Sequence, residues 1–218
     1  MARIWRVAIL VTIAMAALSS AATAAQASGR TAMSRTRSVA THITVKATIP
    51  VGTKPFGIAA DPRTKRIYVA NLGSRTVSVI SARTDTVVAT IRVGRVPVGV
   101  ATDPRTNTIY VTNERSDTVS VISGRTDAVI ATVHGGFQAA FGIAADLRTN
   151  TIYLADGADK TWVISGRTDT VATTVRVGSE PLGVAIDPQA KVIYVTNNGS
   201  DTVTVLTTCR ARAAARCR

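Results

Sequence analysis

The sequence predicts an all-β fold built from four copies of a unit that is about 42 residues long. A Gly-x-Ala-x-Asp segment occurs four times, and it ends at Asp61, Asp103, Asp146 and Asp187. A tyrosine follows seven residues after each aspartate, namely Tyr68, Tyr110, Tyr153 and Tyr194. Self-similarity at a fixed period of this length is typical of propellers and solenoids, in which each repeat is one small supersecondary unit.

Each unit is expected to contain four short antiparallel strands. In the first unit their ranges are 57–60, 67–70, 76–80 and 86–93. The first strand ends at Asp61-Pro62, because proline has no N–H to donate to a ladder and aspartate bonds its own backbone in a turn. The second strand ends at Asn71, which suits the next turn. The many β-branched residues in these ranges oppose a helix.

The pattern of apolar residues indicates how such sheets pack. Apolar residues fall on both faces of several strands, as expected for a small sheet between two neighbours. Four antiparallel strands in every unit form the blade of a β-propeller. The glycine at the head of each first strand fits this arrangement, because first strands converge on the central axis and their backbones must approach. The predicted fold is therefore an all-β β-propeller with four blades of four antiparallel strands.

The number of strands at the two ends of the repeat predicts how the ring closes. Residues 43–52 match the fourth strand of a unit, while the last unit stops after its third strand near Leu206. We expect residues 43–52 to pair with Thr202–Leu206 and to close the ring, which removes an open sheet edge. The alternatives are an open arc, a half-ring that dimerises or a truncated copy, so the protein is expected to be a monomer or a half-ring dimer.

Two tetrapeptides, at 110–113 and 194–197, read Tyr-Val-Thr-Asn, and the segments 68–71 and 153–156 are looser copies. With the flanking Val-Gly-x-x-Pro-x-Gly, they resemble the YVTN-repeat β-propeller family over about residues 43–206. The resemblance implies an exported or cell-surface propeller. Members of that family share no single activity, and they usually form a larger ring than four blades.

The N-terminus predicts export. Two early arginines precede the apolar run Val7–Leu18, and small residues suited to cleavage follow it. This order is typical of a signal peptide, here residues 1–27, rather than of a membrane span, although an uncleaved anchor is the alternative. We expect a mature chain that starts between Ala25 and Ser28, lacks a transmembrane segment and is periplasmic, cell-surface or extracellular.

The formal net charge of +13 is concentrated toward the ends of the chain. Residues 28–41 are interpreted as a disordered basic linker, residues 42–208 as the propeller, and residues 209–218 as a basic Cys/Arg/Ala tail. Such a tail is either an ordinary disordered end or the product of a frame change. Basic ends attract polyanions, including DNA, without selecting one, so weak and salt-sensitive polyanion binding is one alternative function.

Motifs that would identify a reaction are missing from the sequence. The two histidines share no metal-ligand spacing with each other or with cysteine, and no nucleophile elbow, phosphate loop or dinucleotide fingerprint is present. We therefore expect no catalytic residues, no metal and no cofactor. The predicted function is a non-catalytic binding scaffold at the cell envelope. The alternative is a propeller enzyme of the lactonase or lyase kind, which depends on analogy between folds.

The third unit collects the irregularities of the repeat. Its preceding link is one residue longer than the others and its second-to-third turn is one residue shorter, and in an antiparallel meander both lie on one rim. A protein or small-ligand site there is one interpretation, since binding residues favour loops on a rigid scaffold. Neutral drift, with a tryptophan filling space between sheets, is the other. The candidate residues are His134, Phe137, Gln138, Asp156, Asp159, Lys160 and Trp162.

Overall fold

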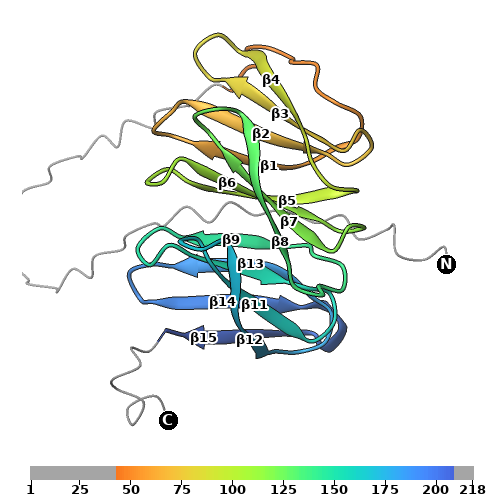
Figure 1. The fold of residues 1–218 in the computed structure, drawn as a ribbon, viewed down its shortest axis with the longest axis vertical. Helices are drawn as coiled ribbons and strands as arrows, with labels where there is room; N and C mark the ends of the chain where they lie inside the picture. Colours follow the sequence, from red (N-terminus) through yellow and green to blue (C-terminus); the bar gives the residue numbers. More distant parts are fainter. Residues whose placement is uncertain (1–42, 209–218) are drawn as a thin grey trace, which may run out of the picture. The chain divides into compact units, whose positions relative to one another are not determined.

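The computed structural model describes residues 43–208, which form fifteen strands and one short 3-10 helix (Figure 1). The first sheet consists of β1 (Pro55–Asp61), β2 (Arg66–Asn71), β3 (Thr76–Ser81) and β4 (Thr86–Arg92). The second consists of β5 (Pro97–Asp103), β6 (Thr108–Asn113), β7 (Thr118–Ser123) and β8 (Ala128–His134). The third consists of β9 (Ile143–Asp146), β10 (Thr151–Ala155), β11 (Lys160–Ser165) and β12 (Thr170–Arg176). The last contains β13 (Pro181–Asp187), β14 (Val192–Asn197), the helix η1 (Asn198–Ser200) and β15 (Thr202–Thr207).

Every sheet is an antiparallel meander in chain order, and three sheets have four strands while the last has three. The all-β prediction and the repeated strand pattern are therefore confirmed. The sheets belong to one compact unit that begins at Val45. Successive sheets contact each other through their first strands, from β1 to β5, β9 and β13 (Figure 1).

The core lies between successive sheets. At the first junction Tyr68 and Val79 pack against Ile109 and Val111 of the next sheet. Equivalent apolar clusters fill the second and third junctions. The repeated tyrosine is a core residue in the first three sheets, and burial raises the pKa of the Tyr110 hydroxyl. Because each sheet covers its neighbour, a single unit has no complete core of its own.

The repeated polar residues fix the turns. Asp61 Oδ1 accepts hydrogen bonds from the backbone N–H groups of Arg63 and Thr64, at 2.9 and 3.2 Å. The aspartates that end the other first strands also accept bonds from the backbone N–H two residues on. A local bond of this kind stabilises a turn without help from distant residues.

The expected ring closure is corrected by the structure. Residues 43–50 form no strand, and among residues 43–208 β15 is a free edge of the three-stranded last sheet. Thr53 and Lys54 make the bonds to the β2–β3 turn that the other links make to the sheet that follows them, with Thr53 N–H to Ser74 Oγ at 3.1 Å and Leu72 N–H to Lys54 O at 3.0 Å. Lys46 forms an ion pair with Asp85 of the first sheet at 2.6 Å, so residues 43–208 leave the last sheet without a fourth strand.

The predicted signal peptide, basic linker and C-terminal tail lie outside the described residues. In residues 43–208, no helix is both long enough and apolar enough to cross a membrane.

Candidate functional site

The links between sheets and the second-to-third turns share one edge of the protein, which we call the link rim. It comprises the links 51–54, 93–96, 135–142 and 177–180 and the turns 72–75, 114–117, 156–159 and 198–201. Backbone bonds join each kind to the other, as in Glu114 N–H to Val96 O and Asn198 N–H to Glu180 O, both 2.9 Å. The expectation that both irregular segments of the third unit lie on one rim is therefore confirmed.

Asp156 and Trp162 form a pair that replaces an asparagine–hydroxyl pair of the other sheets. The Trp162 Nε1–H group donates to Asp156 Oδ2 at 2.7 Å, and Asp156 Oδ1 accepts from Ala158 N–H at 3.0 Å. In the first sheet the corresponding bond runs the other way, from Asn71 Nδ2 to Ser78 Oγ at 2.9 Å. The second and last sheets have the same asparagine bond. In the third sheet the turn residue Asp156 is thus the acceptor and the strand residue Trp162 the donor, the reverse of the other sheets.

Phe137 explains how the third unit accommodates a tryptophan. The rings of Phe137 and Trp162 are perpendicular, with centroids 5.0 Å apart, which is a favourable edge-to-face contact. Phe137 is buried in the cluster between the second and third sheets, and Trp162 packs against that cluster. Gly135 lies against the Phe137 ring, where a Cβ atom would be 2.4 Å from Cε1. The longer link therefore supplies an aromatic side chain to the core.

The other four candidate residues lie nearer the solvent. His134 and Gln138 are exposed on the link rim. Asp159 forms an ion pair with Arg176 at 3.5 Å, and Lys160 is half-buried at the start of β11. The seven candidates thus divide into an aromatic–carboxylate group, in which Phe137 and Asp156 are buried and Trp162 is half-buried, and a polar surface above it. A ligand-binding role for them stays a prediction.

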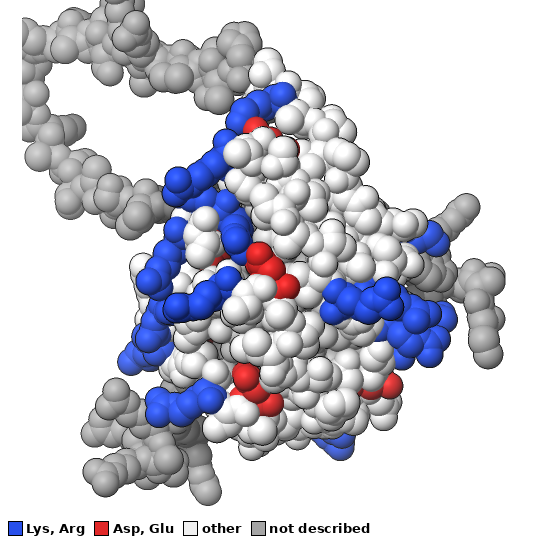
Figure 2. Space-filling model, turned by 45° about the horizontal axis from the view of Figure 1, so that its top comes forward, with Lys and Arg blue, Asp and Glu red and all other residues white. Residues whose placement is uncertain are grey.

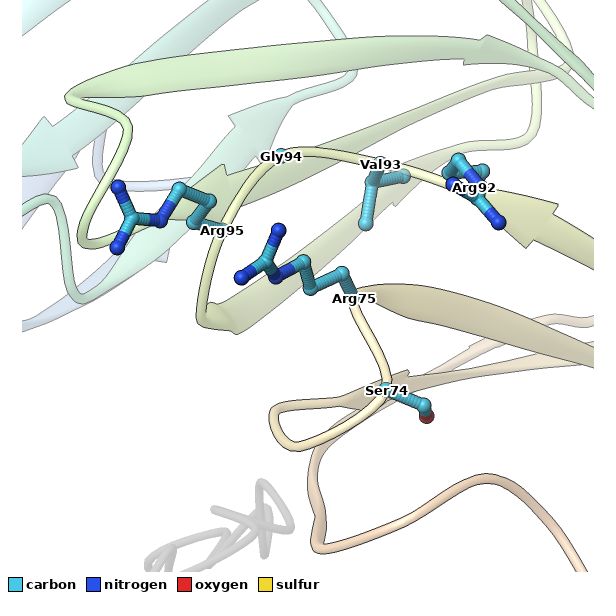
Figure 3. Close-up of a pocket in the computed structure, with 6 residues that line it drawn as sticks. All are labelled: Ser74, Arg75, Arg92, Val93, Gly94 and Arg95. Carbon is cyan, nitrogen blue, oxygen red and sulfur yellow. The ribbon is translucent and has the colours of Figure 1, made fainter.

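A hollow of about 190 Å³ lies elsewhere on the link rim, at the junction of the first and second sheets. Its lining residues are Ser74, Arg75, Arg92, Val93, Gly94 and Arg95. The Arg75 side chain extends from its turn toward the link, whereas the Arg95 side chain leaves the link on the opposite side, and Arg92 lies before the link at the end of β4 (Figure 3). In the space-filling view, lysine and arginine side chains gather toward the margins of the protein (Figure 2).

The arginines of this hollow lack ion-pair partners in the described part of the chain. No carboxylate of residues 43–208 lies within 4.0 Å of a nitrogen of Arg75, Arg92 or Arg95. A guanidinium group presents several N–H donors in a fixed plane and binds carboxylate or phosphate oxygens in pairs. The guanidinium groups of this hollow thus have the donor chemistry that suits an anionic group. The described residues contain no cluster of three or more His, Cys, Asp or Glu side chains that could hold a metal ion.

Reasoning from the sequence did not single out this hollow, although a signal was present. Arg75 has a positive φ of 56°, and the second and last sheets have Asp117 and Asp201 at the same turn position. Arg95 occupies the link position that is Ser179 in the last sheet, since both backbone N–H groups bond to the serine of the adjacent turn. The equivalent turn and link of other sheets thus fold with other residues at these two positions, so neither arginine is needed for folding.

Two aspartates at one repeat position differ in their charge environment. Asp127 pairs with Arg66 of the preceding sheet. Asp169, its counterpart in the third sheet, has an Oδ1 atom that is buried without a hydrogen-bond partner among the described residues, and desolvation raises the pKa of its carboxyl group. The ionised form of Asp169 is therefore destabilising, whereas that of Asp127 is stabilising.

We expect the substitution Asp169→Asn to raise the free energy of unfolding at neutral pH by about 0.5 kcal/mol. Folding raises the pKa of the Asp169 carboxyl group. The wild-type side chain therefore contributes most to the free energy of unfolding below its unfolded pKa of about 3.9, and this contribution is lost as pH rises through the pKa of the folded state. The gain should disappear below about pH 4. Asparagine also tolerates the positive φ of 52° at this position. Urea unfolding across pH measures the effect.

Asp127→Asn is the matched control, and it should lower stability at neutral pH because it leaves Arg66 without its carboxylate partner. Destabilisation by both variants at pH 7 would contradict this account of Asp169.

Comparisons with known proteins place the fold. No family model and no curated protein matches the chain. Among solved structures, hydrazine synthase of Kuenenia stuttgartiensis is similar, with a TM-score of 0.65 and 23% sequence identity. The match covers 76% of this chain and 48% of that chain, so this chain spans about half of its length. The likeness shows the fold alone, which is an all-β, propeller-like series of antiparallel sheets.

Proposed function

We propose that the protein is an exported, non-catalytic β-propeller scaffold of the YVTN-repeat type that binds an anionic partner at the cell envelope. The observation that carries the proposal is the hollow on the link rim, which Arg75 and Arg95 both line with no carboxylate of the described residues within ion-pair distance. The partner would carry phosphate, sulfate or carboxylate groups, which guanidinium donors recognise in pairs.

The same rim offers a wider contact surface. Gly157 brings the shortened turn of the third unit close to the long link, since a Cβ atom there would lie 3.1 Å from Gln138 O. The buried Phe137 and Asp156 and the half-buried Trp162 support this part of the rim from below. His134, Gln138 and Lys160 are then the polar groups available to a partner. Binding residues on loops above a rigid scaffold are a common arrangement.

The test uses substitutions that the protein already contains at equivalent turn and link positions. The double variant R75D/R95S introduces the residues found at 117 and 179, so the fold should be unchanged. Binding of labelled inorganic polyphosphate and of a sulfated polysaccharide is measured by fluorescence anisotropy. We expect at least about tenfold weaker binding, because hydrogen bonds to charged groups contribute roughly 1.5–3 kcal/mol each.

The control R83D/R125S makes the same change in net charge on exposed arginines of the third-to-fourth turns. Equal weakening by both double variants would show a long-range charge effect and would overturn the proposed site. The tail variant R210S/R212S addresses polyanion binding by the basic end instead, and a larger loss there than in R75D/R95S would favour that alternative. Export is tested by mass measurement of protein recovered outside the cytoplasm, and an intact Met1 would count against it.

A further inference from the structure

The last sheet has an open apolar face. Tyr194 is 40% exposed and Val203 and Val205 are each 55% exposed. The residues at the same positions of the first sheet, Tyr68, Val77 and Val79, are fully buried because the second sheet covers them. The last sheet therefore has the face that packs against a following sheet, and residues 43–208 contain no following sheet.

The last sheet also has the glycine that allows a following first strand to approach closely. A Cβ atom on Gly57, Gly99 or Gly142 would lie 2.0–2.4 Å from a backbone carbonyl oxygen at or just before the next first strand, so a side chain cannot fit there. Gly183 is the fourth member of the series, yet the three atoms nearest to its Cβ atom would all belong to the side chain of Thr196. The residue type that close approach of a strand requires is thus present where the described residues place no strand.

Thr196 adds a hydrogen-bonding group to the same face. In the second sheet Thr112 Oγ1 accepts from Gly99 N–H at 2.7 Å and donates at 2.9 Å to Phe141 O, in the link just before β9. Thr196 Oγ1 accepts from Gly183 N–H at 2.9 Å, and the described residues offer its own hydrogen no acceptor. The hydroxyl group is placed to donate to the carbonyl oxygen of a first strand that would follow.

The first sheet has the complementary open face. Phe56 and Ile58 of β1 are 53% and 67% exposed. The corresponding residues at the three internal junctions, Val100, Ile143 and Val184, pack against the preceding sheet. At the second junction the accepting carbonyl is that of Phe141, in the link just before β9, and Phe56 holds the equivalent repeat position in β1. The chain thus carries both halves of one more junction.

The last sheet also lacks a fourth strand that the chain contains. Residues 44–49 read Thr-Val-Lys-Ala-Thr-Ile, close to the Thr-Val-Val-Ala-Thr-Ile of β4. Val87 of β4 is half-buried, whereas Val45 at the equivalent position is 85% exposed and belongs to no strand. An edge strand tolerates Pro50 at the position of Arg92, because its N–H need not join a ladder.

We propose that a second copy of this chain covers both open faces, so that two copies join head to tail. At each of two identical junctions, β13 of one copy lies against β1 of the other, and residues 45–50 of that other copy pair with β15 as the missing fourth strand. A second copy is the occupant because one chain carries both complementary faces, the free edge and the unpaired strand sequence. Head-to-tail contacts of this kind close into a ring when the rotation allows, and eight sheets lie within the range of known propellers.

The pairing of β3 with β4 gives the expected register. Val77 lies opposite Ile91, and Val79 lies opposite Ala89. By equivalence, Val203 of one copy lies opposite Ile49 of the other, and Val205 lies opposite Ala47. This register removes the free edge of β15, which otherwise remains open to pairing with any strand.

Sedimentation of the full chain tests the association. The wild type is expected to be a dimer, and V205D should raise the dissociation constant at least about a hundredfold, because a charge would be buried in an apolar junction. The control I130D changes an equally exposed residue, at 59%, on an internal sheet and should leave the dimer intact. G183A should also weaken the dimer. A monomeric wild type, or equal dissociation by I130D and V205D, would overturn the proposal.

Cross-linking tests the exchanged strand. In a background with Cys209 and Cys217 changed to alanine, the single variants A47C and V205C are mixed and oxidised. A disulfide-linked dimer containing one chain of each kind is the expected result. The double variant A47C/V205C forming an internal disulfide in a monomer would show closure within one chain, and that result, or the absence of any cross-link, would overturn the exchange.

Discussion

Replacing Gly142 with alanine is expected to lower the free energy of unfolding by about 3 kcal/mol, since overpacking a tight backbone contact costs roughly this much. The new Cβ atom would lie 2.2 Å from Leu182 O and 3.0 Å from the Gly183 Cα, and both are backbone atoms of the next first strand. The third and last sheets would have to separate. For a protein of this size the loss corresponds to a fall in melting temperature of about 6–12 °C, which calorimetry measures.

G183A is the matched control for G142A, measured in the V205D background so that association does not contribute. In a single chain its Cβ atom meets the side chain of Thr196 rather than backbone atoms of another strand, so the loss of stability should be roughly 1 kcal/mol, well below that of G142A. Similar losses from both substitutions would show that the glycines serve the strand backbone itself rather than the contact between sheets.

The second large effect is expected from the Asp156–Trp162 pair. D156N should cost about 2 kcal/mol, because Trp162 Nε1–H and Ala158 N–H donate to different oxygens of Asp156, and in asparagine one of them would face an NH2 donor. W162S should cost roughly 3–4 kcal/mol, because it leaves a cavity beside Phe137. Urea unfolding measures both values.

The double variant D156N/W162S decides between pairing and independent packing. It restores the asparagine–serine pair that Asn71 and Ser78 form in the first sheet, so its cost should fall short of the sum of the single costs by about 1–2 kcal/mol. Strictly additive costs would show that the two residues act independently, and the exchange of donor and acceptor would then have no energetic meaning.

Much of the fold could be predicted because its signals are local. The strand-ending aspartates bond backbone groups two residues away, so the turn is encoded within a few positions of Asp61 and its counterparts. The tyrosine repeat reflects burial at the same place in successive sheets, as at Tyr68 and Tyr110. The candidate site was predicted only in part. The rim was found from segment lengths, which depend on strand order, whereas the partners of Trp162 lie in a turn and a link that its own sequence neighbourhood does not reveal.

The sequence by itself determined the sheets, their strand order, their turns and the rim on which links and turns meet. The tertiary structure alone decided that residues 43–50 leave the last sheet unpaired, that Asp156 holds Trp162, and that Arg75 and Arg95 line one hollow. The physical reason is the sequence separation of the residues that interact. Strands and turns follow from periodicity and backbone bonding over a few residues, while closure depends on how rotations between whole sheets accumulate. A side-chain pair or hollow likewise depends on neighbours that only packing brings together.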